Sequence, residues 1–127
     1  MLRSLIFGLL ALLLAALPLA AEELVMVEQP GCAYCMEWNR TIAPIYPKTA
    51  EGKFAPLRRA QLRDGPPPGV DFDRAVVFTP TFILVKDGKE LARIEGYPGE
   101  DFFWGLLGRM LDQHTNFNPQ GDRPAKS

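Results

Sequence analysis

The chain is poor in residues that hold metal ions or covalently attached cofactors. Its 127 residues include two cysteines and one histidine. Structural zinc usually takes four ligands, whereas Cys32, Cys35 and the distant His114 supply at most three, so a zinc site would need cysteines pooled from a second copy. Covalent haem attachment requires a histidine directly after the second cysteine, where this chain has Met36. We therefore expect neither a cofactor nor a metal site within one copy.

The chain also lacks a strong charge of either sign. Lys and Arg together number 14 and Asp and Glu number 15, which gives a formal net charge of −1. The sequence has no basic stripe and no basic patch with interleaved aromatic residues, the features typical of nucleic-acid binding. Nucleic acid is therefore not an expected partner.

The apolar run at the N-terminus differs from the rest of the chain. A basic residue precedes a mainly apolar run over residues 5–17, and a proline and small residues follow it. This order is typical of a secretory signal peptide, and the run is shorter than the roughly 18 residues that span a bilayer. We expect a signal peptide at residues 1–21, cleaved after Ala20 or Ala21, and a periplasmic location; the alternative is an uncleaved membrane anchor.

The remainder is long enough for one small domain with a single core. We expect this domain at residues 22–114 and a flexible tail at residues 115–127.

Hydrophobic periodicity predicts an α/β fold. Strands are expected at 24–29 and 53–62 and in a hairpin of 81–85 and 90–94 around Asp87-Gly88; helices are expected from Cys32 and from Glu100, with a helical turn at 72–76. The predicted order is strand, helix, strand, short helix or loop, strand, strand, helix. A parallel unit followed by an antiparallel hairpin gives a mixed four-stranded sheet flanked by helices.

The two cysteines lie at the start of the first predicted helix. Cys35, Trp38, Ile42 and Ile45 recur at spacings of three and four and should face inward, whereas Cys32 should lie at the exposed helix start. Pro44 should kink or end this helix.

This placement favours redox chemistry over a structural crosslink. A disulfide between residues three apart closes almost no loop, so it would stabilise the fold little. Free N–H groups and the positive end of the helix dipole stabilise a thiolate at Cys32 and lower its pKa. Cys35 could then attack a mixed disulfide formed at Cys32. Tyr34, between them, either contacts a partner or is simply an exposed aromatic residue.

The motifs "CAYC" after a strand and "FTPTFILVKDGKELARIEGY" resemble the thioredoxin superfamily over about residues 24–113. The resemblance implies that Cys32 and Cys35 are catalytic. It also implies that Pro80 is a cis-proline facing the cysteine sulfurs, and that the main chain of Thr79 pairs with a bound substrate.

The sequence departs from ordinary thioredoxins beside the cysteines. Those proteins have "CGPC" after a tryptophan, whereas this chain has Gly31, Ala33 and Tyr34; they bury an aspartate where this chain has Met26. Glu28 is the remaining candidate for the group that carries the proton of Cys35.

The stretch "EQPGCAYCMEWN" most resembles SoxS-type periplasmic thioredoxins of bacterial sulfur oxidation. This resemblance implies a monomeric thiol–disulfide reductase that keeps the cysteine of a sulfur-carrier protein reduced, with a membrane thiol-electron transporter as the electron donor. The alternatives are a disulfide oxidase or isomerase, which "CAYC" also permits, and a metal-binding chaperone. The reduction potential distinguishes the first two.

Overall fold

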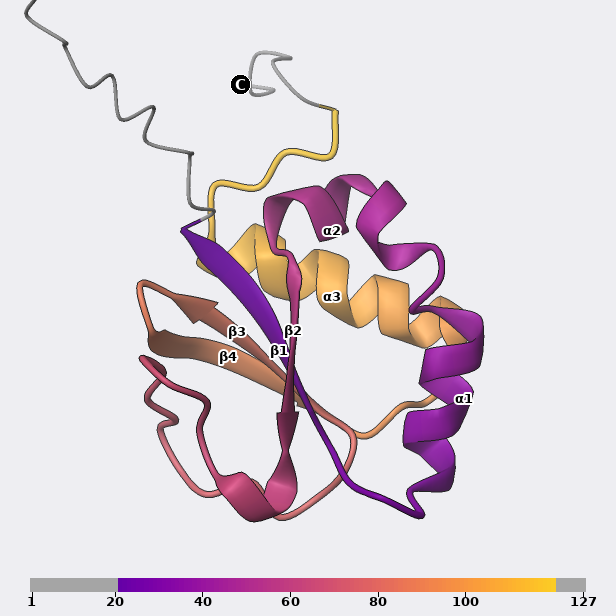
Figure 1. Cartoon of the computed structure of the whole chain (residues 1–127). Helices are drawn as coiled ribbons and strands as arrows, with labels where there is room; N and C mark the ends of the chain where they lie inside the picture. Colours follow the sequence, from indigo (N-terminus) through magenta and orange to yellow (C-terminus); the bar gives the residue numbers. More distant parts are fainter. Residues whose placement is uncertain (1–20, 121–127) are drawn as a thin grey trace, which may run out of the picture.

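The computed structural model describes residues 21–120, which form a four-stranded sheet with three α-helices (Figure 1). The elements in chain order are β1 Glu22–Glu28, α1 Ala33–Thr41, the 3-10 helix η1 Tyr46–Lys48, α2 Ala50–Phe54, β2 Leu57–Gln61, the 3-10 helix η2 Leu62–Asp64, β3 Thr81–Lys86, β4 Lys89–Glu95 and α3 Glu100–His114. Except for Ala21, the predicted signal peptide lies outside the described residues. None of the helices in residues 21–120 is long and apolar enough to cross a membrane.

The sheet has the predicted mixed topology. Its order is β2-β1-β3-β4, in which β1 pairs parallel with β2 and antiparallel with β3, and β3 and β4 form the hairpin. Asp87 and Gly88 both have positive φ, 51° and 80°, as a two-residue type I′ hairpin turn requires. The predicted α/β class and element order are confirmed.

Alternate residues of the central strands face two different coverings. On one face, Leu24, Met26, Phe82 and Leu84 join a core completed by all three α-helices. The other face is formed by the valine and isoleucine side chains of β1 and β3. These pack against the long segment between β2 and β3, which contributes the buried Val70 and the partly buried Leu62, Phe72 and Val76. Helices therefore cover one face of the sheet, and the segment between β2 and β3, which contains no α-helix, covers the other (Figure 1).

Aromatic side chains dominate the helical face. Trp38 is fully buried and its ring lies 5.1 Å from that of Phe82 and 5.7 Å from that of Phe103. Tyr46 is also fully buried and donates a hydrogen bond from its hydroxyl to the carbonyl of Ala55 at 2.5 Å. Burial raises the pKa of Tyr46 above its ordinary value, so the hydroxyl keeps its proton as the donor.

Several predicted element boundaries are wrong. Strand β2 begins at Leu57 rather than Lys53, because Thr49 caps α2 by accepting a hydrogen bond from the N–H of Gly52 at 3.0 Å. Helix α1 ends at Thr41, which agrees with the prediction that Pro44 kinks or ends it, but Ile45 then lies beyond the helix and is 44% exposed, so its predicted inward position is wrong.

The segment between β2 and β3 also differs from the prediction. The helical turn expected at 72–76 does not form; a 3-10 helix forms earlier, at Leu62–Asp64, and Asp71 makes a bridge with Lys89 at the start of β4. Phe117, within the predicted tail, packs against Phe54 with ring centroids 5.1 Å apart. Residues 121–127 of that tail lie outside the described part.

Candidate functional site

The two cysteines form a disulfide at the N-terminus of α1. Their Cα atoms are 5.2 Å apart. Cys32 is the N-cap residue with extended backbone, φ −81° and ψ 104°, and its Sγ accepts a hydrogen bond from the N–H of Cys35 at 3.1 Å. Cys35 is 2% exposed, whereas Cys32 is half-buried. Both cysteines therefore have the predicted positions, with the more accessible sulfur at the helix start.

The helix start places these sulfurs in different environments. A sulfur at an N-cap lies next to backbone N–H groups and the positive end of the helix dipole, both of which stabilise a thiolate. The N–H of Cys35 already makes such a contact with Cys32 Sγ. Cys35 is shielded from outside reagents but lies within bonding distance of Cys32. This arrangement suits attack by the first sulfur and release by the second.

The loop before β3 lies beside the cysteine loop. The side chain of Gln29 donates a hydrogen bond from Nε2 to Thr79 Oγ1 at 2.8 Å, and the Gln29 carbonyl accepts one from the N–H of Cys32 at 3.3 Å. Gln29 therefore joins Thr79 to the turn that leads into Cys32. Gln29 is not among the site residues predicted from the sequence, although its position directly after β1 could have indicated a loop contact.

Thr79 and Pro80 differ in how their main-chain groups are hydrogen-bonded. The peptide bond between them is cis, and the carbonyl of buried Pro80 accepts a hydrogen bond from the N–H of Gly96 at 2.7 Å. The hydroxyl of Thr81 donates to the carbonyl of Phe78 at 2.7 Å. Within residues 21–120, the main-chain N–H and C=O of Thr79 have no hydrogen-bond partner.

Large apolar side chains are exposed on the segments around this site. Tyr34, the residue between the cysteines, is 66% exposed, so it does not belong to the core. The other examples on these segments are Met36, Val77 and Phe78. Exposed apolar groups on segments that meet at one place are typical of a surface for binding another protein.

A groove begins at Tyr34 and runs between α1 and the segment that joins β4 to α3. Its volume is about 870 Å³, and Glu37, Tyr97 and Glu100 are among its lining residues. The hydroxyls of Thr41 and Tyr97, both of which line the groove, hydrogen-bond at 2.8 Å and tie its two sides together. Residues of α1 and of the segment between β4 and α3 therefore form the two sides of the groove.

Met26 and Glu28 occupy different environments. Met26 is fully buried, with its Sδ 3.7 Å from Arg59 Nη1. The carboxylate of Glu28 accepts hydrogen bonds from Arg59 Nη1 at 2.7 Å and from Asn39 Nδ2 at 3.2 Å. Within residues 21–120 no hydrogen bond joins Glu28 to either cysteine. Its role as a proton carrier stays a prediction.

His114 is the last residue of α3, and its side chain is exposed. Within residues 21–120 no group of three or more His, Cys, Asp or Glu residues is arranged to hold a metal ion.

Comparisons with known proteins agree with this geometry. A family model described as a thioredoxin-like domain matches residues 20–111. The structure is similar to that of the periplasmic thioredoxin SoxS from Paracoccus pantotrophus in its reduced form, with 54% sequence identity and a TM-score of 0.70 over 72% of this chain and 97% of that chain. Thioredoxin from Fasciola hepatica has 20% identity and a TM-score of 0.51 over 72% of this chain and 82% of that one, which is a likeness of fold. A search of curated proteins finds no significant match.

Proposed function

The chain belongs to the thioredoxin-like family and is a thiol–disulfide oxidoreductase, and from this premise we propose that it is a periplasmic reductase of a partner protein's cysteine. The observation that carries the direction and the location is the 54% identity with a periplasmic SoxS over 97% of that chain. The aligned part amounts to 72% of this chain.

The proposed reaction uses both sulfurs in turn. The Cys32 thiolate attacks one sulfur of the partner's disulfide, and the other sulfur of that disulfide leaves as a thiolate. Cys35 then attacks Cys32 Sγ, which releases the partner's remaining thiol and forms the Cys32–Cys35 disulfide. Two electrons pass to the partner, which also takes up two protons. The accessible position of Cys32 and the burial of Cys35 support this assignment.

The loop before β3 has a proposed role in holding the partner. The unpaired main chain of Thr79 can add an extended substrate segment by strand-like hydrogen bonds. Pro80 fixes the direction of that main chain, and the exposed ring of Tyr34, between the two cysteines, contacts the partner.

The proposed partner is a sulfur-carrier protein of a thiosulfate-oxidising system, because the chain resembles SoxS-type proteins. A membrane thiol-electron transporter would return the disulfide to the dithiol. Reduction of a carrier cysteine requires no further group in this chain beyond its two sulfurs.

Trapping in cells tests this proposal. In a sulfur-oxidising bacterium, Cys35→Ser should accumulate mixed disulfides that disappear on reduction, because the resolving sulfur is missing. Cys32→Ser is the matched control and should form none. Mass spectrometry should identify a sulfur-carrier protein among the adducts. A broad sample of secreted cysteine-rich proteins would instead indicate an oxidase or isomerase, and bound metal without adducts would indicate a chaperone.

A further inference from the structure

A buried ion pair lies on β4, the edge strand of the sheet. The side chains of Glu90 and Arg93 are 2% and 5% exposed, and Arg93 Nε donates to Glu90 Oε1 at 2.7 Å while Nη2 donates to Oε2 at 3.0 Å. In a regular strand, residues three apart point to opposite faces. Here Leu84 pairs with Ala92 and Val85 with Glu90, so Leu91 is an extra residue that brings both side chains to the same face.

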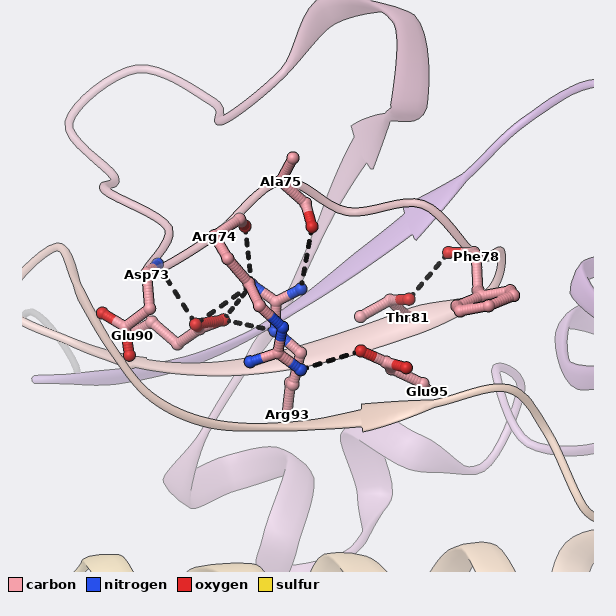
Figure 2. A network of polar contacts seen from close by, with 8 residues as sticks. All are labelled: Asp73, Arg74, Ala75, Phe78, Thr81, Glu90, Arg93 and Glu95. Atoms are coloured by element: carbon pink, nitrogen blue, oxygen red, sulfur yellow. Dashed lines mark hydrogen bonds and ion pairs between the residues drawn. The ribbon is translucent and has the colours of Figure 1, made fainter.

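Glu90 and Arg93 also form hydrogen bonds with the main chain of the segment that leads into β3. Glu90 Oε2 accepts a hydrogen bond from the N–H of Asp73 at 3.2 Å. The guanidinium of Arg93 donates to the carbonyl of Arg74 at 2.9 Å and to that of Ala75 at 3.5 Å (Figure 2). Three consecutive residues of an irregular segment are thereby fixed by two side chains. We refer to Glu90 and Arg93 as the clamp.

The clamp limits the freedom of the proposed substrate loop. Only residues 76–78 separate Ala75 from Thr79, and Val77 and Phe78 among them are 69% and 59% exposed. If the clamp were removed, the last residue before Thr79 whose main chain is hydrogen-bonded to the hairpin would be Asp71. Its N–H donates to the carbonyl of Gly88, and its carbonyl accepts from the N–H of Glu90. Residues 72–78 would then separate the attachment from Thr79. A longer free segment covers a wider range of positions.

We propose that Glu90 and Arg93 are positioning residues that set where the main chain of Thr79 meets an extended substrate. This inference rests on the proposed substrate role of Thr79 and Pro80. The clamp does not touch the reacting sulfurs; it acts through the segment between Asp73 and Thr79. The charged groups of its two side chains form hydrogen bonds with each other and with the main chain of the loop, as a buried charge pair requires.

The test compares two probes with the same leaving group. One is a ten-residue peptide with a single central cysteine, and the other is cysteine alone, each carried as a mixed disulfide with thionitrobenzoate. The reduced protein attacks the cysteine sulfur and releases the coloured thiolate, which gives a rate constant for each probe. The peptide rate divided by the cysteine rate reports the contribution of main-chain contacts and excludes the intrinsic reactivity of Cys32.

We expect this ratio to be about ten or more in the unaltered protein and to fall roughly tenfold, toward one, in Arg93→Lys, because misplacement of a contact by about an ångström costs this much or more. Lysine keeps a charge for Glu90 but lacks the planar fork that reaches two carbonyls. Glu90→Gln, which keeps an acceptor oxygen, is the second variant if Arg93→Lys fails to fold. Arg74→Gln is the matched control, because within residues 21–120 that side chain bonds only to Glu95 at the end of β4, and such an exposed ion pair contributes little, so the ratio should not change.

The outcomes separate the two proposals. A ratio of one in the unaltered protein would contradict the proposed substrate role of Thr79. A ratio above one that both clamp variants retain would overturn the positioning role, even if urea unfolding shows that they are less stable. An equal fall in the rates for the peptide and cysteine probes would also overturn the positioning role, since the substitution would then affect the reactivity of the sulfurs or the fold as a whole.

Discussion

The two faces of the sheet are built from alternate residues of the same strands but are covered in different ways. Three helices cover one face with fully buried aromatic rings, and α1 of this layer carries the cysteines. The other face is covered by a segment with three successive prolines, held by partly buried apolar residues and by the Glu90–Arg93 clamp. Apolar packing therefore dominates the layer that carries the cysteines, whereas the other covering combines apolar contacts with a buried ion pair.

The first prediction compares the same substitution on both faces. Phe103→Ala should lower the free energy of unfolding by about 3–5 kcal/mol, because Phe103 is fully buried against Trp38 and Phe82. Phe72→Ala should cost about 1 kcal/mol, because Phe72 is only partly buried against the other face. Urea unfolding of both variants measures the difference. Equal costs would show that the two coverings are energetically alike.

The second prediction concerns the close approach between the crossover segment and the hairpin turn. A Cβ added at Gly88 would lie 2.3 Å from the carbonyl oxygen of Gly69, and φ is +80° there. Gly88→Ala should therefore destabilise the protein by about 1–3 kcal/mol. Thermal unfolding would reveal the loss. A neutral result would mean that the crossover segment moves away from the turn at little cost.

The third prediction is the matched glycine change on the helical face. Gly105 lies within α3, its surroundings are open and its φ is not positive. Gly105→Ala should stabilise the protein by about 0.5–1 kcal/mol, because alanine loses less backbone entropy in a helix. Urea unfolding beside Gly88→Ala tests the opposite signs. A loss of stability in both variants would show that α3 does not accept a Cβ at position 105 without cost.

The fourth prediction concerns the contact between the two regions. The hydrogen bond from Gln29 to Thr79 joins the cysteine loop to the loop before β3 and is exposed to solvent. In a double-mutant cycle, Gln29→Ala and Thr79→Ala should show a coupling of about 0.5 kcal/mol in unfolding free energy. Additive effects would show that the side chains do not couple the loops in solution.

The sequence predicts best where neighbouring residues decide the structure. Asp87-Gly88 between two apolar strands specifies the hairpin, and cysteines three apart at the start of a helical pattern specify one buried and one more accessible sulfur. The errors arise where nearby residues compete. Lys53 looks like part of a strand until Thr49 is recognised as a helix cap, and Pro44 ends the helical pattern before Ile45.

The clamp and the Gln29 contact could not be predicted in this way. Glu90 and Arg93 face the same side only because of the bulge at Leu91, which depends on the pairing with β3. Gln29 and Thr79 are 50 residues apart and meet through the fold. Such contacts leave no periodic pattern in the sequence. They must be read from the three-dimensional arrangement.

The bridge between Asp71 and Lys89 affects how the protein meets other extended chains. Strand β4 is an edge strand, and an uncovered edge can recruit a strand from another molecule and lead to aggregation. Asp71 occupies part of that edge through main-chain hydrogen bonds to Gly88 and Glu90. This part of the edge is thereby shielded from strand pairing with other molecules, while the main-chain N–H and C=O of Thr79 stay unpaired within residues 21–120.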